Sequence, residues 1–522
     1  MSGAKPCAGQ PGLLLDLLLA MPLGAAHSLP FAHTWAWPLQ MAIVAALAWR
    51  VSLASPWRAA WLGLIFGTAW LAAGTWWLFI SLHTYGGLSA WLAVLAIGLL
   101  SAFLSLYLAA GLALFARWRC GSALRDALLF GAVWLLAELA RGVIFTGFPW
   151  VASGYAHVDG PLAALAPWLG VYGIGAIGAV LSAWLVLGSG RSFRARAVPI
   201  GALVFVLGTA ALLGPGRFSQ PNGTLTVTLL QGNVAQDEKF ALAAMPQALT
   251  WTRKNLLAAR GELVVAPETV IPLLPSQLDA GYWQTIADHF QSGPQAVLLG
   301  LPLGDEVAGY SNSAAGISAA TVSLPNGFYR YDKHHLVPFG EFIPFGFRWF
   351  TELMNIPLGD FNRGPIGAPS FAFRGERFGA NICYEDLFGE ELAARFKNAA
   401  DAPTIFANIS NIGWFGDTIA ITQHLEISRM RALEFQRPML RATNTGATAV
   451  IDHTGRVTAS LPRFTQGVLD GQVQGRTGLT PFAWWASRFG LWPLTLAALA
   501  IVVLAAARSR RDRQPRFGRT RL

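Results

Sequence analysis

The chain has 522 residues, of which 54% are hydrophobic and only 13% are charged. This composition is too apolar for an ordinary soluble enzyme. The formal net charge of +10 does not favour nucleic-acid binding, because the excess lies in short loops beside apolar runs and in the C-terminal tail.

Long apolar runs fill the first part of the chain and return near its end. A helix needs about 20 apolar residues to cross a bilayer core. We therefore expect a membrane domain at 1–215 with seven transmembrane helices, an eighth helix in 483–507 and an Arg-rich tail at 508–522. The candidate spans lie at 11–31, 34–49, 59–82, 88–116, 124–140, 162–188, 197–214 and 489–507, the first two interrupted by Asp16, Pro22 and Pro38.

Arginines are unevenly divided between the loops that these spans define. If the N-terminus is cytoplasmic, the opposite short loops hold only Arg141, which we expect to pair with Glu138 at the outer interface. This asymmetry follows the positive-inside rule, and it predicts a multi-pass membrane protein with both termini in the cytoplasm and 216–482 on the outer side. The cytoplasmic loops and tail hold Arg50, Arg58, Arg117, Arg119, Arg125, Arg191, Arg194, Arg196, Arg508, Arg510, Arg511, Arg513, Arg516, Arg519 and Arg521.

Residues 216–482 read as a separate domain in which short β-rich runs alternate with polar helical stretches. This alternation predicts a layered α/β architecture, and the segment is long enough to bury a core of its own. Candidate strands are 224–231, 262–267, 296–301, 313–323, 377–383, 403–409, 447–452 and 467–472, and candidate helices are 240–260, 281–291, 389–398 and 420–436.

Three side chains of this domain carry the chemistry that acyl transfer needs. Glu268 and Cys383 each follow an apolar strand run, and the carboxyl ends of strands are where α/β sheets place their ligands. A thiol attacks as the thiolate and needs a base, which Glu268 can be. Lys333 and a backbone N–H after the cysteine can stabilise the oxyanion. The order Glu, Lys, Cys therefore indicates transfer through a thioester, and the membrane setting indicates a lipid acyl group.

Taken singly, each of these side chains also fits an ordinary structural role. A lone cysteine at a strand end is usually a small buried hydrophobic residue, a glutamate after a strand is usually solvated, and Lys333 beside Asp332 would usually form a surface pair. Spacing alone is therefore a weak signal.

Neither a disulfide framework nor a metal site is expected. Cys7, Cys120 and Cys383 are too few and too far apart to suggest a framework. His334 and His335 are adjacent and lack the spacing of metal ligands.

Several segments resemble the nitrilase superfamily of carbon–nitrogen hydrolases and, more closely, the apolipoprotein N-acyltransferase family. The resemblance spans nearly the whole chain and implies an αββα sandwich beside the membrane helices. Two residues depart from the family pattern: Phe240 replaces a usual Trp, and Ile412 replaces a polar residue. The matching segments are 231–233, 266–268, 333–341, 382–385, 410–416, 430–434 and 437–438 in the outer domain, and 146–150 and 159–162 in the membrane domain.

The resemblance implies a two-step reaction without a cofactor, carried out by a chain that we expect to be a monomer. Cys383 would take the sn-1 acyl chain of a glycerophospholipid and pass it to the α-amine of a diacylglyceryl-modified cysteine on an apolipoprotein. Glu268 would be the base and Lys333 the oxyanion stabiliser. Supporting roles would fall to Glu341, Tyr384 and Glu385, and a mobile substrate-binding arm or lid would include Phe240, Trp414 and Phe415.

Two other functions remain open at this point. One is a membrane-tethered amidase or nitrilase that transfers the acyl group to water. Eight spans and an aromatic-rich outer loop at 145–168 are more than a tether needs. The other is a non-catalytic lipid-binding or transport protein, which would have no reason to keep Glu268, Lys333 and Cys383 together.

Overall fold

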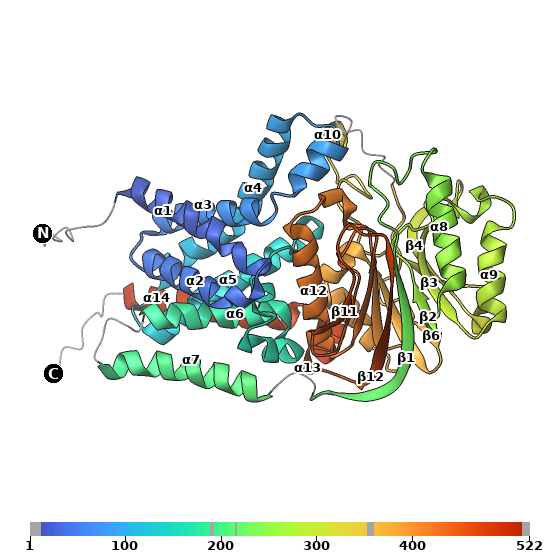
Figure 1. Ribbon diagram of the computed structural model, residues 1–522. Helices are drawn as coiled ribbons and strands as arrows, with labels where there is room; N and C mark the ends of the chain where they lie inside the picture. The colour runs from blue at the N-terminus through green and yellow to red at the C-terminus, as the bar shows by residue number, and fades with distance from the viewer. Residues whose placement is uncertain (1–11, 188–192, 214–216, 352–359, 514–522) are drawn as a thin grey trace, which may run out of the picture.

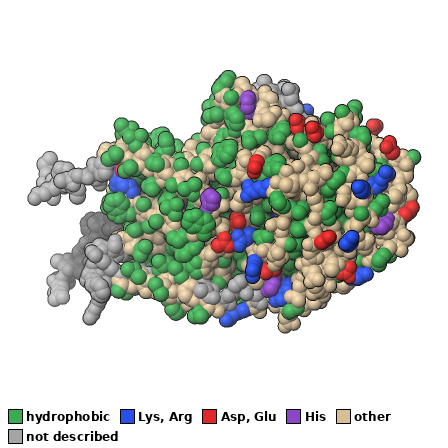
Figure 2. Space-filling view, viewed as in Figure 1, with side chains coloured by type: hydrophobic (Ala, Val, Ile, Leu, Met, Phe, Trp, Pro, Cys, Tyr) green, Lys and Arg blue, Asp and Glu red, His purple; other side chains and the backbone are tan. Residues whose placement is uncertain are grey.

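The computed structural model describes residues 12–187, 193–213, 217–351 and 360–513, so Cys7 and the end of the Arg-rich tail lie outside the described part of the chain. A helical region and an α/β domain lie side by side (Figure 1). Hydrophobic side chains crowd the surface of the helical region, whereas charged side chains are spread over the α/β domain (Figure 2).

Each of the eight predicted spans contains a helix. Among the described residues, five helical segments are long and apolar enough to cross a membrane: Leu13–Phe31, Ala90–Trp118, Ala123–Thr146, Pro161–Leu187 and Trp492–Arg511. The count of eight spans therefore stays a prediction. The helices are α1 (Leu13–His27), α2 (Trp37–Ser52), α3 (Pro56–Gly74), α4 (Ala90–Trp118), α5 (Ala123–Val143), α6 (Ala166–Leu187), α7 (Phe193–Leu213) and α14 (Trp492–Arg513).

The predicted span 59–82 is wrong in its second half. Helix α3 ends at Gly74, and the chain turns before a separate π-helical segment, Ile80–Tyr85. Apolar content alone does not reveal this break, because both sides of it are equally hydrophobic.

Arginines pair with two buried carboxylates of the helical region, Asp16 and Glu138. Asp16 in α1 accepts hydrogen bonds from Arg50 (2.6 Å) and from Arg58, near the ends of α2 and α3. Glu138 and Arg141 in α5 pair at 3.7 Å, as expected, but each is only 3% exposed. The pair therefore lies inside the protein rather than at the outer interface where the sequence had suggested it.

The α/β domain is built on two six-stranded sheets packed face to face. The strand order is β12-β1-β2-β3-β4-β5 in the first sheet and β11-β10-β9-β8-β7-β6 in the second. Their facing side chains form one core, which includes Leu229 and Val265 from the first sheet and Phe378 and Ile382 from the second. The first sheet comprises β1 (Ser219–Gln231), β2 (Leu263–Val265), β3 (Ala296–Asp305), β4 (Gly309–Ile317), β5 (Tyr329–Asp332) and β12 (Gly467–Gly478). The second comprises β6 (Phe371–Phe373), β7 (Glu376–Ile382), β8 (Ile405–Ser410), β9 (Met439–Thr443), β10 (Ala449–Ile451) and β11 (Val457–Ser460).

Helices cover the outer face of each sheet, which completes the predicted αββα sandwich. On the first sheet, α8 (Met245–Ala258) and α9 (Tyr282–Ser292) bury Leu256 and Phe290 against the strands. On the second sheet, α11 (Gly389–Ala393), α12 (Ile419–Phe435) and α13 (Pro481–Phe489) bury Phe435 and Phe482.

Several predicted boundaries in this domain are wrong. The expected strand 313–323 ends at Ile317, because Ser318 begins a short helical turn, and the expected helix 240–260 begins at Met245. Strands β5, β6, β9 and β11 and helix α13 had no counterpart in the prediction. These elements are short, with three to nine residues each, so their periodicity is weak.

The α/β domain packs on the helical region through α12 and the segment after β7. Ile427 and Met430 of α12 share one buried core with side chains of α5 and α6, and Leu387 and Phe388 belong to the same core. Gln423 Oε1 accepts hydrogen bonds from two indole N–H groups of the helical region. The ends of β7 and β8 are therefore held against the membrane helices.

Candidate active site

Glu268 follows β2 and is held by both sheets. Its Oε1 accepts a hydrogen bond from Asn312 Nδ2 (2.7 Å) on β4 of its own sheet. Its Oε2 accepts one from the backbone N–H of Asn411 (2.8 Å), the residue that follows β8 in the other sheet. The carboxylate therefore lies at the junction of the sheets.

Lys333 follows β5, and its side chain is only 1% exposed. Its Nζ donates a hydrogen bond to Glu341 Oε1 (2.9 Å) and lies 3.4 Å from Glu268 Oε1. Burial alone would lower the pKa of Lys333, but the charges of Glu341 and Glu268 outweigh it and raise the pKa above its ordinary value. The ammonium is therefore charged near neutral pH.

Glu341 completes a compact group of one ammonium and two carboxylates. Besides Lys333 it binds Asn312, whose Nδ2 lies 2.7 Å from Glu341 Oε1. Its Oε2 accepts from the backbone N–H of Val337 (2.8 Å). Asn312 thus bridges Glu268 and Glu341, and both carboxylates approach Lys333 Nζ.

Cys383 directly follows β7 in a backbone conformation that is rare for a residue with a side chain. Its φ is +52°, a left-handed value that is costly outside glycine and is often found at functional sites. The thiol is half-buried. Burial, and then the negative charge of Glu268, raise its pKa to about 12, although Lys333 acts in the opposite direction. The resting thiol is therefore neutral and needs a base for attack.

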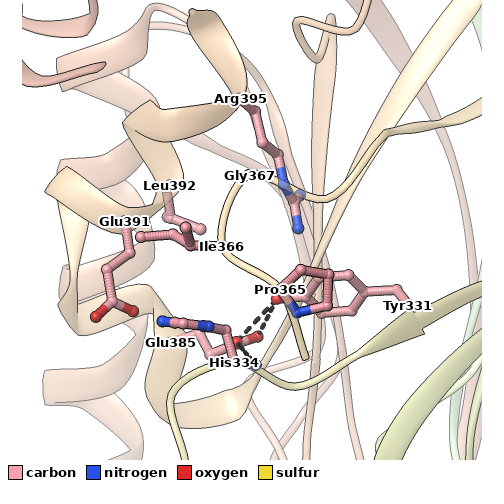
Figure 3. A pocket seen from close by; sticks show the side chains of 9 residues that line it. All are labelled: Tyr331, His334, Pro365, Ile366, Gly367, Glu385, Glu391, Leu392 and Arg395. Carbon is pink, nitrogen blue, oxygen red and sulfur yellow. Dashed lines mark hydrogen bonds between the residues drawn. The ribbon is translucent and has the colours of Figure 1, made fainter. Parts of the chain in front are cut away.

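Glu385 links the turn after Cys383 to the turn that carries Lys333. Its carboxylate accepts from the backbone N–H groups of Ile382 (2.7 Å) and His334 (2.7 Å) and from Tyr331 Oη (2.8 Å). Figure 3 shows the carboxylate meeting Tyr331 and His334. Burial raises the pKa of Glu385, whereas Lys333 lowers it.

Tyr384 connects the turn after β7 to the helical region. Its hydroxyl donates to the backbone carbonyl of Gly147 (3.1 Å) in the loop after α5. Its side chain is 5% exposed and packs in the core shared by the two regions. Tyr384 and Glu385 therefore hold the segment after Cys383, the first against the helical region and the second against the turn after β5.

The small cavity behind Glu385 is not a substrate site. It has a volume of about 10 Å³, room for little more than one water. Glu268, Lys333 and Cys383 are not among the residues that form its wall. The wall consists of Tyr331, His334, Pro365, Ile366, Gly367, Glu385, Glu391, Leu392 and Arg395 (Figure 3).

The three predicted arm residues lie in different surroundings. Phe415 packs on Trp77 (ring centroids 4.3 Å apart) and Trp414 on Tyr85 (5.7 Å), so the segment after β8 contacts the segment between α3 and α4. Phe240 lies before α8 and is 47% exposed. Ile412, where the family has a polar residue, is 1% exposed and packs inward, so the turn forms without the polar side chain.

Several residues of the site had not been predicted. Asn312 and Asn411 hold Glu268, and the buried Lys239 donates from Nζ to the Glu268 backbone carbonyl (3.0 Å). Burial lowers the pKa of Lys239 to about 8. The signal for Asn411 was its place in the segment 410–416, which resembles the family, whereas Lys239 lies just before the predicted helix 240–260 in a segment that shows no pattern. Among the residues that the structure describes, no group of three His, Cys, Asp or Glu side chains could hold a metal ion.

Comparison with known proteins identifies both parts of the chain. Residues 23–184 match the apolipoprotein N-acyltransferase N-terminal domain, and residues 226–482 match the carbon-nitrogen hydrolase family. An apolipoprotein N-acyltransferase of Verminephrobacter eiseniae is 53% identical over 94% of this chain and 95% of the relative. One of Ralstonia nicotianae is 47% identical over 94% and 93%. The solved carbon-nitrogen hydrolase of Helicobacter pylori G27 is 16% identical, with a TM-score of 0.35 over 52% of this chain and 94% of that one. The chain therefore belongs to the apolipoprotein N-acyltransferase family and is a membrane-bound acyltransferase.

Proposed function

We propose that the chain transfers the sn-1 acyl chain of a glycerophospholipid to the N-terminal amine of a diacylglyceryl-modified apolipoprotein, through a thioester on Cys383. The observation that supports this most is the position of the Glu268–Lys333–Glu341 group and Cys383. They lie at strand ends on the side of the α/β domain that packs against the helical region. Lipid substrates are costly to remove from a membrane, so a thiol at this boundary suits acyl transfer between two lipid-bearing molecules.

In the first step Cys383 attacks the ester of the phospholipid. Glu268 takes the thiol proton while Sγ bonds to the carbonyl carbon. The carbonyl oxygen becomes an oxyanion, which the fixed charge of Lys333 stabilises. The C–O bond then breaks, Glu268 returns the proton to the leaving oxygen, and lysophospholipid departs from the acyl thioester.

In the second step the acceptor amine attacks the thioester carbonyl carbon. Glu268, again ionised, takes a proton from the amine, and Lys333 stabilises the second oxyanion. The C–S bond breaks, the amide forms and the sulfur regains its proton. Glu341 keeps Lys333 charged and in place through both steps, because it binds Nζ at 2.9 Å.

Intact-mass spectrometry of the protein after incubation with one defined phospholipid tests this function. Without acceptor, the protein should gain the mass of one acyl chain, and hydroxylamine should remove it. Adding a diacylglyceryl peptide should then transfer the chain to its amine. An acyl adduct that still forms on Cys383→Ala would contradict the proposal. So would an adduct that is hydrolysed by water while the peptide stays unmodified.

The same proposal includes a topology. Residues 216–482 would be the periplasmic catalytic domain of a monomer in the inner membrane, with spans within 1–215 and 483–507 and the tail 508–522 cytoplasmic. The pairing of Asp16 with Arg50 and Arg58 supports this topology, because it brings the start of α1, the end of α2 and the start of α3 to one side. Reporter fusions at Gly223 and at the C-terminus should report opposite compartments, and matching compartments would contradict it.

A further inference from the structure

His424 lies beneath the nucleophile without belonging to the expected catalytic group. It is fully buried on α12. Its Nε2 lies 3.1 Å from the backbone carbonyl oxygen of Cys383, and its Nδ1 lies 2.6 Å from Nη2 of Arg441 on β9. The imidazole therefore bridges a fixed cation and the backbone of Cys383.

The two contacts determine which nitrogen of His424 carries the proton. A guanidinium has only donors, so Nδ1 must accept from Arg441. The proton of the neutral ring is then on Nε2, which donates to the Cys383 carbonyl. Burial, and then the charge of Arg441, lower the pKa of His424 well below its ordinary value and keep the ring neutral.

Arg441 is itself firmly held, so it can orient the ring. Its Nη1 donates to Ser428 Oγ (2.7 Å), and its Nε donates to the carbonyl of Ala447 (3.1 Å). Asp386 lies 3.7 Å from the guanidinium and provides the opposite charge. The ring of His424 consequently has one orientation that satisfies both nitrogens.

The carbonyl that His424 binds belongs to the residue with the left-handed backbone. Asn408 Nδ2 donates to the same oxygen from β8 (3.3 Å), so two donors on neighbouring elements fix the peptide between Cys383 and Tyr384. The direction of this peptide sets where the thiol points and where the N–H of Tyr384 points. Loss of one donor would allow the backbone of Cys383 to relax from its left-handed conformation toward one with a negative φ.

The flat face of the His424 ring contacts the helical region. Its ring stacks on Trp150, with centroids 5.6 Å apart and planes 13° apart. The carbonyl of Trp150 accepts from Arg141 in α5 (2.6 Å). A continuous set of contacts therefore runs from a membrane helix through Trp150 and His424 to the backbone of Cys383.

We propose that His424 is a positioning residue for the acyl transfer, which holds the Cys383 carbonyl and aligns the nucleophile with the helical region through Trp150. This inference rests on the proposed role of Cys383 as the nucleophile. It assigns to His424 no proton transfer and no contact with substrate. Its effect is on the orientation of the thiol and should appear in the rate of the acylation step rather than in phospholipid affinity.

Two amide variants separate the contacts of His424. In His424→Gln, the longer side chain can accept from Arg441 through its oxygen and donate to the Cys383 carbonyl through its nitrogen. In His424→Asn, the oxygen can still accept from Arg441, but the nitrogen falls short of the carbonyl. His453→Ala, a half-buried histidine in the turn after β10, is the matched control.

The measurement is single-turnover formation of the acyl adduct from a defined phospholipid by full-length protein in detergent. His424→Asn should slow the adduct rate by about 100-fold, the usual cost of a misplaced reacting group, with little change in the concentration that gives half-maximal rate. His424→Gln should recover most of this loss, and His453→Ala should match the unmodified protein. Trp150→Leu should also slow the adduct rate, and by less than His424→Asn.

Other outcomes would overturn the proposal. Equal adduct rates in unmodified protein and His424→Asn would show that the carbonyl contact does not matter. Equal loss in the Gln and Asn variants, together with lower melting temperatures, would show that His424 only packs the core.

Alkylation of Cys383 by iodoacetamide, followed in parallel by mass spectrometry, separates failure of the His424 proposal from failure of the proposed function. If the unmodified protein forms no acyl adduct although Cys383 is alkylated, the function itself is wrong.

Discussion

The centre of the site and its rim are held in different ways. At the centre, Lys333 is 1% exposed and Glu268 is 7% exposed, and every charge meets an opposite charge or a hydrogen-bond donor. At the rim, Phe415 and Trp414 rest on other aromatic rings, and Phe240 is 47% exposed. Buried charges are costly to leave unpaired, whereas aromatic contacts are weak and tolerant. Changes at the centre should therefore abolish chemistry, and changes at the rim should adjust substrate binding.

Removal of the proposed nucleophile, Cys383, should have the largest effect. Cys383→Ala should form no acyl adduct and no amide product, because no second thiol is near the Glu268–Lys333 group among the described residues. Cys383→Ser should be equally inactive, since a carboxylate ionises an alcohol far less readily than a thiol. Cys120→Ala removes an exposed cysteine between α4 and α5 and serves as the control. Turnover that survives in Cys383→Ala would place the nucleophile elsewhere.

Removal of the central cation should be nearly as severe. In Lys333→Met the oxyanion loses its partner, and the acylation rate should fall by about 10²–10³-fold, the loss typical of a single oxyanion donor. Glu268 and Glu341 would also be left as two buried carboxylates facing each other, so the melting temperature should fall. Lys397→Met, at an exposed position in the same domain, is the control. Single-turnover acylation and thermal unfolding measure the two effects, and an unchanged acylation rate would exclude Lys333 from the chemistry.

Glu268→Gln should separate two effects of this carboxylate on Cys383: its charge, which raises the pKa of the thiol, and its proposed role as the base. Its charge raises the pKa of the thiol, so the neutral variant should have a lower pKa and a larger thiolate fraction at a given pH. Alkylation by iodoacetamide at pH 8 should then speed up, roughly tenfold for each unit by which the pKa falls. Acyl-adduct formation should instead slow, because the base is gone.

The pH profile of alkylation provides the control for this prediction. In the unmodified protein the rate should rise steadily between pH 7 and pH 10 without a plateau, because the thiolate is the reactive form and the pKa of about 12 lies above that range. A plateau near neutral pH would show that Cys383 is already ionised at rest. Faster acylation in Glu268→Gln would show that the carboxylate is not the base.

The sequence predicted the centre better than the surroundings that hold it. Glu268 and Cys383 could be expected to converge because both follow apolar strand runs, whose carboxyl ends are where α/β sheets place their ligands. The sequence did not show that their strands, β2 and β7, belong to different sheets. The resemblance of 333–341 to the family then supplied Lys333 and Glu341 together. These inferences needed only strand periodicity and a motif.

The supporting contacts could not be predicted because they join distant parts of the chain. Asn411 meets Glu268 across the two sheets, and His424 meets Cys383 from a helix, so neither contact has a local pattern. The break after Gly74 and the short strand β6 (Phe371–Phe373) were missed for another reason. Neither changes the hydrophobicity of its segment enough to alter a periodic signal.

The smallest effect should come from the rim. Phe415→Leu removes the ring that packs on Trp77 and leaves the charges of the centre untouched. The concentration of phospholipid at half-maximal rate should rise roughly two- to tenfold, which corresponds to an aromatic pair worth about 0.5–1.5 kcal/mol, and the maximal acylation rate should change little. Trp283→Leu breaks a similar aromatic pair, with Phe328, on the outer layer of the first sheet and is the matched control. Steady-state kinetics with vesicles of one phospholipid measure both constants. If Phe415→Leu lowers the maximal rate as strongly as Lys333→Met, the rim is part of the catalytic centre and the contrast between them does not hold.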